Sequence, residues 1–326
     1  MIPNFSYIRV KSVEDAVVQL SDKGSRVMAG GTDLLGCLRD GVLGADKIVS
    51  ITRVDELQGI KGTPDGGLRI GALTTITEIS ENPIIMKRYP GLAEAASNVG
   101  SPQLRNQGTI GGNLCQKPRC WYYRGDFHCL RKGGELCYAM EGENQYHAIF
   151  GYDKICAIVH PSDTAPALIA CGAAVRVVGP SGSRLVPVEG LYVLPKVDVK
   201  RETVLKPGEI ISEIILPKPA EGSKSSYRKA RARRSWDFAL VGTAFAVEFK
   251  DGKIQKARAV FSGVAPVPWR SNEVEEAITG RKLDAQTVSK AAAMAVKNAE
   301  PLEGNEYKVP MLMGLVEEEL LRLARS

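Results

Sequence analysis

The chain has 326 residues, of which 44% are hydrophobic and 25% charged, and its formal net charge is +6. This composition is that of a globular protein with enough apolar side chains for more than one core, and no apolar run reaches the roughly 18 residues of a membrane-spanning helix. Residues 1–7 lack the basic and apolar regions of a signal peptide, so we expect a cytoplasmic protein; a signal carried by a partner would not show in this sequence.

Short helices and strands are predicted along the first hundred residues. Residues 11–20 predict a helix that Ser12 caps, with Asp15 returning the hydrogen bond. Thr77 is expected to cap a second helix, and an alanine-rich helix follows around 92–96. The expected strands cover residues 26–29, 46–51 and 68–73.

Two glycine-rich segments interrupt this pattern. The first, Gly30-Gly31-Thr32-Asp33, stands between a predicted strand and a predicted helix over 34–39. This arrangement presents several backbone N–H groups to an anion, and glycine lets a phosphate approach them closely. The second segment, residues 101–113, is polar, glycine-rich and long for a simple turn, and it is a second candidate for close backbone approach to a cofactor. One such turn has many ordinary explanations, whereas two within about 80 residues favour a cofactor site.

Five of the seven cysteines lie between residues 115 and 156, which indicates a metal site rather than disulfide bonds in a reducing compartment. Cys120, Cys129 and Cys137 are spaced nine and eight residues apart, and Cys156 or Cys115 could supply a fourth thiol. This spacing leaves an iron–sulfur cluster and zinc both open. The remaining thiols, at 37 and 171, are expected to pack in the interior.

Other polar residues have weaker interpretations. His128 and His147 are expected to support the thiols or lie at the surface rather than to bind a metal. The basic run 228–234 is interpreted mainly as a solvated segment, because no interleaved aromatic residues or zinc-finger spacing indicate nucleic acid.

The last hundred residues predict a sheet backed by helices. Two strands over 237–249 and 254–263 flank Asp251-Gly252, a strong hairpin turn, and a three-stranded antiparallel sheet is expected. Helices are predicted over 274–279, 285–299 and 311–324. The segment 220–226, rich in glycine, serine and lysine, is the expected domain boundary.

Three motifs in this order carry a resemblance to a known family. They are Ala29-Gly30-Gly31-Thr32-Asp33-Leu34, Gln103-Leu104-Arg105-Asn106-Gln107-Gly108-Thr109-Ile110-Gly111-Gly112-Asn113 and His160-Pro161-Ser162-Asp163. Over essentially its whole length the chain resembles the FAD-binding medium subunit of the molybdenum hydroxylases, the xanthine dehydrogenase family. The resemblance implies an α+β fold. A FAD-binding domain of the vanillyl-alcohol oxidase and para-cresol methylhydroxylase type is expected over 1–219, and a C-terminal α+β domain of the CO dehydrogenase flavoprotein type over 220–326.

The resemblance also implies roles for individual residues. Two loops would hold FAD, with further contacts from Asp163, from Ile211 beside the flavin ring, and from Lys229. The residues implied in the loops are Ala29, Gly30, Gly31, Thr32, Asp33, Leu34 and Leu35, and then Thr109, Gly111, Gly112 and Asn113.

Roughly 45 residues separate the second loop from the segment 160–163, whereas most relatives have almost none. This insert, about 115–156, resembles that of the flavin subunits of 4-hydroxybenzoyl-CoA reductase and of a bacterial molybdenum aldehyde oxidoreductase. That likeness implies a [4Fe–4S] cluster on Cys120, Cys129, Cys137 and Cys156. Trp121, Tyr122 and Tyr123 are expected to pack over the cluster or the flavin.

The function implied is that of an electron-transfer subunit with no catalytic residue of its own. Its expected partners are a molybdopterin-binding large subunit, a small [2Fe–2S] subunit and a ferredoxin-like electron carrier, in a heterotrimer. The substrate, an aldehyde or an aromatic CoA thioester, would bind on the large subunit. Two alternatives stay open, a self-contained flavin oxidoreductase of the same fold and a zinc-stabilised binding module. The sequence leaves the direction of electron flow undetermined.

Overall fold

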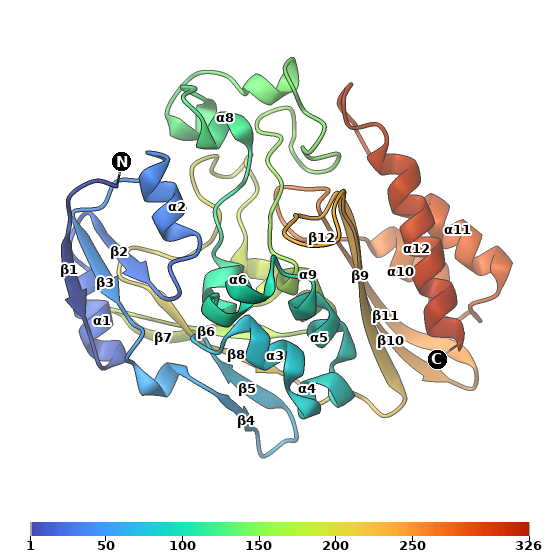
Figure 1. Cartoon of the computed structure of the whole chain (residues 1–326). Coiled ribbons are helices and arrows are strands. Elements are labelled where there is room, and N and C mark those ends of the chain that lie inside the picture. Colours follow the sequence, from blue (N-terminus) through green and yellow to red (C-terminus); the bar gives the residue numbers. More distant parts are fainter. Residues whose placement is uncertain (1, 326) are drawn as a thin grey trace.

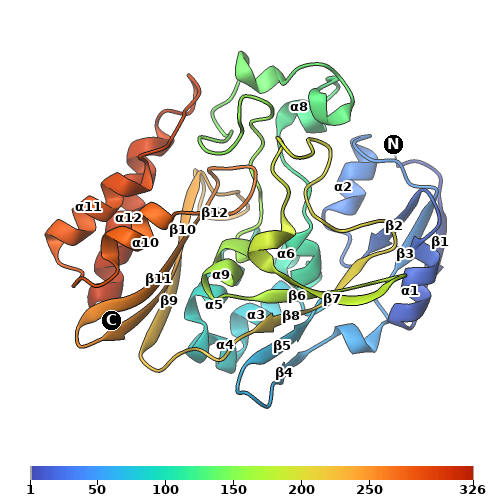
Figure 2. The ribbon, with the colours of Figure 1, turned by 180° about the vertical axis from the view of Figure 1, so that it is seen from behind.

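Three β-sheets lie side by side and are connected by short helices (Figures 1 and 2). The computed structural model describes residues 2–325. A small N-terminal sheet lies beside a larger central one, and the C-terminal sheet stands on the far side of the central helices. Within the described residues, no helix is both long and apolar enough to cross a bilayer.

The N-terminal sheet is parallel, with strand order β1-β3-β2. Its elements are β1 (Ser6–Arg9), α1 (Val13–Leu20), β2 (Ser25–Met28), α2 (Leu34–Arg39) and β3 (Lys47–Ser50). The middle strand β3 is buried because it pairs on both edges. Ser12 caps α1 as predicted, since its side chain accepts from the Asp15 backbone N–H, but the predicted return bond to the Asp15 side chain is not found among the described residues. The four buried residues of α1 (Val13, Ala16, Val17 and Leu20) recur at helical spacing and form one apolar face.

The central sheet has five antiparallel strands in the order β4-β5-β8-β6-β7. The strands are β4 (Ile60–Gly62), β5 (Leu68–Gly71), β6 (Ala174–Gly179), β7 (Gly182–Pro187) and β8 (Ile210–Leu216). The helices packed with this domain are α3 (Ile76–Glu81), α4 (Pro83–Arg88), α5 (Pro90–Ser97), α6 (Pro102–Gln107), α7 (Ile110–Leu114) and α9 (Thr164–Ala170). Single 3₁₀ turns cover Asp55–Leu57 and Val188–Leu191.

The predicted cap of the second helix is wrong. Thr75, not Thr77, caps α3, because the Glu78 side chain accepts from the Thr75 backbone N–H and completes a capping box. The segment 101–113 forms two short helices, α6 and α7. Ser101 and Thr109 cap these helices, and such caps satisfy the first backbone N–H groups of segments too short for the hydrophobic pattern to reveal.

The C-terminal sheet has the strand order β12-β11-β10-β9 and is antiparallel throughout. Its elements are β9 (Ser223–Ala230), β10 (Val241–Lys250), β11 (Lys253–Ser262), β12 (Trp269–Arg270), α10 (Asn272–Ile278), α11 (Ala285–Ala295) and α12 (Lys308–Arg325). The expected three strands are therefore joined by a fourth, which at two residues is too short to show an alternating pattern. Asp251 and Gly252 form the predicted hairpin turn, both with positive φ.

Because side chains alternate between the two faces of its strands, this sheet packs against a different hydrophobic core on each face. Ala244 and Val260 pack into the core of the central domain, whereas their neighbours Phe245 and Phe261 pack with the helices α10–α12. The C-terminal sheet is thus covered on both faces and fixed against the central domain.

The insert lies at one end of the molecule, between α2 and the segment leading into α12 (Figures 1 and 2). It consists mainly of loops with one helical turn, α8 (Trp121–Arg124), and two 3₁₀ turns, Leu130–Lys132 and Tyr138–Met140. Its own small apolar cluster is built around Ala139, Ala148, Tyr152 and Ala157.

Candidate functional site

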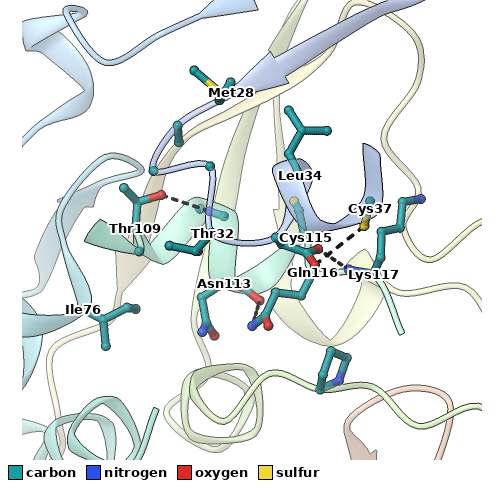
Figure 3. Close-up of a pocket in the computed structure, with 18 of the residues that line it drawn as sticks. Met28, Thr32, Leu34, Cys37, Ile76, Thr109, Asn113, Cys115, Gln116 and Lys117 are labelled. Carbon is teal, nitrogen blue, oxygen red and sulfur yellow. Dashed lines mark hydrogen bonds between the residues drawn. The ribbon is translucent and has the colours of Figure 1, made fainter. Parts of the chain in front are cut away.

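A cavity of about 520 Å³ opens between the N-terminal sheet and the central domain (Figure 3). Twelve of the fourteen residues predicted to contact FAD line it. They are Ala29, Gly30, Gly31, Thr32, Asp33, Leu34, Thr109, Gly111, Gly112, Asn113, Asp163 and Ile211. Leu35 and Lys229 are not among its lining residues. The fold therefore brings both glycine segments, which are about 80 residues apart, to one cavity.

The first glycine loop joins β2 to α2 and touches the second segment directly. A side chain on Gly30 would place its Cβ only 1.8 Å from the Gln107 carbonyl oxygen. Gly31 adopts φ +73°, in the left-handed region that favours glycine. These two positions require glycine for backbone reasons, and the absence of side chains leaves the backbone exposed to the cavity.

The second segment reaches the cavity through the start of α7. Thr109 Oγ1 accepts from the Gly112 N–H at 3.3 Å, a bond drawn in Figure 3. Gly111 packs against Ala72, where a Cβ would approach the alanine methyl to 2.9 Å. The Asn113 side-chain oxygen accepts from the hydroxyls of Ser162 and Thr164, so it joins this segment to the start of α9.

Asp163 lies at the centre of a buried network behind the cavity. Its Oδ2 accepts from Lys229 Nζ at 2.7 Å, and its Oδ1 accepts from the Tyr227 hydroxyl at 2.7 Å. Burial, reinforced by the Asp163 charge, raises the pKa of Tyr227 well above its ordinary value, so it stays a neutral donor. The Lys229 ammonium, whose side chain is fully buried, acts on the cavity through Asp163 rather than as part of its wall.

Asp33 has a role that the sequence did not indicate. It lines the cavity, but its carboxylate accepts from the Lys117 backbone N–H (2.8 Å), from Arg119 (2.6 Å) and from Arg124 (2.9 Å). Burial by itself would raise the pKa of Asp33, but the nearby Arg119 charge and these hydrogen bonds lower it overall. These contacts of Asp33 hold the first glycine loop against the insert.

The four predicted cluster thiols all lie in the insert. Cys120, Cys129 and Cys137 each immediately precede a helical turn. The backbone N–H groups of the turn that follows act on the Cys120 and Cys137 sulfurs and favour their thiolate forms.

Two of the thiols interact directly. Cys156 donates to the Cys137 sulfur, and this bond is the main cause that lowers the pKa of Cys137 to about 6. Burial raises the pKa of Cys120 to about 11, with smaller contributions from Cys137 and Cys129. Across residues 2–325, no three histidine, cysteine, aspartate or glutamate side chains are already gathered as a metal-binding group. The alternative fourth thiol, Cys115, lines the first cavity instead.

The two histidines of the insert have different environments. His147 is buried, and its Nε2 lies 3.2 Å from Cys120 Sγ. Burial lowers the pKa of His147 to about 4, and the neighbouring Lys308 contributes in the same direction. His128 is exposed. Cys37 is buried as predicted, whereas Cys171 is only partly so.

Aromatic residues of the insert line its surface and its core. Trp121 is 43% exposed and makes an edge-on contact with Tyr146. Tyr122 packs in the insert's own cluster, and Tyr123 is buried under the Arg131 guanidinium.

A second cavity, of about 460 Å³, lies between the insert and the C-terminal sheet. Cys120, Trp121 and His147 line one side of it. It shares five lining residues with the first cavity: Arg119, Pro161, Asp163, Asp237 and Phe238. Two of these shared residues contact each other, since Arg119 lies over the Phe238 ring, 5.1 Å from its centroid.

Two functional residues escaped sequence reasoning. Lys308 and Asn305, at and just before the start of α12, are fully buried and donate to backbone carbonyls of the insert. A lysine at the start of an amphipathic helix ordinarily indicates a solvated position, so the sequence carried no signal for this contact.

Family models match nearly the whole chain. Residues 3–219 match the "FAD binding domain in molybdopterin dehydrogenase", and residues 225–321 match the "CO dehydrogenase flavoprotein C-terminal domain".

Similar proteins and structures agree with these models. The chain is 36% identical to the aldehyde oxidoreductase FAD-binding subunit PaoB of Escherichia coli (strain K12), over 82% of this chain and 83% of that one. It is 28% identical to the carbon monoxide dehydrogenase medium chain of Hydrogenophaga pseudoflava, over 98% and 96%. A solved structure of carbon monoxide dehydrogenase from that organism superposes with a TM-score of 0.79 at 27% identity, covering 100% of this chain and 98% of that one.

Proposed function

The chain belongs to the FAD-binding medium subunits of the molybdenum hydroxylase family, and from this we propose that it carries two redox groups, FAD and a [4Fe–4S] cluster. As a flavin subunit of such a complex it transfers electrons. Membership of the family supports FAD, but it does not by itself establish the [4Fe–4S] cluster. FAD exchanges electrons singly or in pairs and an iron–sulfur cluster exchanges them singly.

The first cavity fits FAD in the chemistry of its walls. The two glycine segments leave backbone against the cavity, with hydroxyls of Thr32 and Thr109 beside them. Apolar side chains that include Ile76, Leu104 and Ile211 also line the cavity. We assign the twelve lining residues named above to FAD, with Lys229 acting through Asp163. Leu35 has no such support, because it lies outside the lining and is 40% exposed.

The insert thiols fit an iron–sulfur cluster in donor type and number. We assign Cys120, Cys129, Cys137 and Cys156 as the ligands, and the N–H groups that favour thiolates at Cys120 and Cys137 support this assignment. Cys137 and Cys156 form a pair, but the four thiols do not form a finished cage, and mainly loop backbone connects them. They would therefore close around a cluster as it binds, as metal sites coupled to folding do.

The main support for this function is that the two cavities share part of their lining. Cys120 lines the second cavity, and Asp163 lines both. A group held by the insert thiols is thus a neighbour of a group held by the glycine segments. This proximity suits an electron connection between them better than it suits a structural zinc site.

The similar proteins support the proposed partners and an aldehyde as the proposed substrate. One is named as a subunit of an aldehyde oxidoreductase and another as the medium chain of carbon monoxide dehydrogenase. We propose a heterotrimer with a molybdopterin-binding large subunit and a small [2Fe–2S] subunit, and a ferredoxin-like carrier as the external partner. An aldehyde or an aromatic CoA thioester would react on the large subunit. The division into domains 1–219 and 220–326, and the cytoplasmic location, stay predictions.

The test is anaerobic purification of the complex, followed by iron, sulfide, zinc and flavin counts and EPR of the dithionite-reduced protein. We expect about four iron and one FAD per chain, in addition to the iron of the small subunit. Cys129→Ala should lose the [4Fe–4S] signal and retain FAD. The matched control, Cys171→Ala, replaces a thiol outside the insert and should retain both groups.

Other outcomes decide between the alternatives. FAD with no iron bound to this chain would contradict the cluster. Zinc with no FAD would favour the binding module and contradict both assignments. Oxidation of a substrate by this chain without the large subunit would favour the self-contained flavin oxidoreductase.

A further inference from the structure

The contacts of His147 support a further inference, which rests on the proposed function. We propose that His147 is a positioning residue for the iron–sulfur cluster. Its Nε2–H donates a hydrogen bond to the Cys120 thiolate, and the segment that begins α12 fixes the histidine in place.

The direction of this hydrogen bond follows from the chemistry of the two groups. Nε2 lies 3.2 Å from Cys120 Sγ. A thiolate bound to iron has no proton to donate, so the imidazole must donate through Nε2–H. The other nitrogen, Nδ1, has no hydrogen-bond partner among the described residues. The backbone of Asn144 also acts on the imidazole and favours a proton on the ring.

The histidine is held from the C-terminal domain. Its backbone carbonyl accepts from Lys308 Nζ at 2.9 Å and from Asn305 Nδ2 at 3.2 Å. Lys308 also donates to the Gly263 carbonyl at 2.7 Å, and Asn305 also donates to the carbonyls of Asn144 and Ala148. The segment leading into α12 reaches the insert at this point (Figure 1). We call Asn305 and Lys308 the α12 latch.

A rigid hydrogen-bond donor at a ligand sulfur changes the reduction potential of a cluster. Adding an electron increases the negative charge on the thiolate sulfurs, so an N–H donor stabilises the reduced form more than the oxidised form. Because the α12 latch fixes the His147 backbone, the donor stays beside the segment that carries Cys120. His147 therefore raises the potential of the cluster relative to a site without this bond.

The first test is an EPR redox titration of the anaerobically purified complex. His147→Leu, which removes the donor, should shift the midpoint potential of the [4Fe–4S] signal to a more negative value with the iron count unchanged. His147→Gln, whose amide can donate, should restore part of the shift. The control is His128→Gln, an exposed histidine of the same insert, which should leave the potential unchanged. An unchanged potential in an iron-replete His147→Leu protein would overturn the proposal.

A second measurement needs no substitution at the cluster. In the wild-type complex with ¹⁵N-labelled histidine in this chain, ENDOR of the reduced cluster should show a weak coupling to a histidine nitrogen. A strong coupling would mean that His147 is itself a ligand, and no coupling would mean that the bond is absent; either result contradicts the proposal. A wild-type protein that binds no iron would instead contradict the proposed function, so the two failures are distinguishable.

Discussion

Gly30 shows how one residue can join two distant segments. Its backbone lies against the Gln107 carbonyl, so the absence of a side chain allows the two glycine segments to meet. Gly31 adds a backbone conformation that other residues rarely adopt. The sequence indicated both positions as glycines for a phosphate, but the structure shows that Gly30 also serves the packing of one segment on the other.

Gly30→Ala should therefore reduce bound FAD strongly and destabilise the protein by about 2 kcal/mol, the usual range for forced overpacking. The added Cβ would lie 1.8 Å from the Gln107 carbonyl oxygen, and a backbone oxygen cannot rotate away as a side chain can. Flavin content after purification and the urea midpoint measure the two effects. Gly44→Ala is the control, because a Cβ added at Gly44 would meet no atom within 4 Å and Gly44 lies in the same domain. Full FAD content in Gly30→Ala would contradict this account of the loop contact.

The insert is an element with little regular structure, and ion pairs fix its first part. Asp33 receives three hydrogen bonds from residues 117–124, as described above. A second carboxylate, Glu202, pairs with Lys117 and with the buried Arg131. Removing one partner from such a network leaves buried charges unpaired, and this costs more than an exposed ion pair contributes.

Asp33→Asn should lower the free energy of unfolding at pH 7 by about 3 kcal/mol and make the insert more sensitive to proteolysis. The pKa of Asp33 is lowered in the folded protein, so its contribution is complete above the unfolded value of about 3.9 and is lost as the pH falls further.

The difference in urea midpoint between wild type and Asp33→Asn should thus shrink below about pH 4. Asp40→Asn is the control. The Asp40 carboxylate comes no closer than 3.9 Å to the Arg124 guanidinium, and its other ion-pair partner, Arg39, is exposed. A difference that stays constant from pH 7 to pH 3 would show that the Asp33 charge is not the source of the stability.

At the scale of the whole molecule, the C-terminal domain holds the insert through the α12 latch. Lys308 is fully buried and has carbonyl oxygens as its partners. Burial lowers the pKa of Lys308 to about 7. Between that value and the ordinary one near 10.5, the unfolded chain keeps a proton that the folded protein has released. Stability therefore rises with pH across this window.

The urea midpoint of the wild type should increase between pH 7 and pH 9 relative to that of Lys308→Met, by about 2 kcal/mol in free energy. The methionine variant has no proton to release, so its stability should lack this rise. Lys297→Met, which replaces an exposed lysine of the same domain, should behave like wild type. Equal pH dependence in all three proteins would contradict the assignment of the low pKa to Lys308.

The sequence by itself determined the elements and motifs whose signals are local. The cap at Ser12, the Asp251-Gly252 turn and the three long C-terminal helices depend on neighbouring residues, and the structure contains them close to the predicted positions. Local signals failed where competing caps were close together, as at Thr75 and Thr77, and where elements were very short, as at α7 and β12. Two glycine segments in order, with the motif at 160–163, were enough to identify the family.

Only the tertiary structure decided which distant residues meet. The cavity needs residues 29–34, 109–113 and 163 together, and the wall it shares with the second cavity needs residues of the insert and of the loop before β10. Asp33 binds the insert, Lys229 acts through Asp163, and Lys308 holds His147. Each is a charged side chain that sequence patterns assign to solvent or to a ligand. Burial with a partner distant in sequence changes that role, and the identity of this partner is set by the packing of the three sheets.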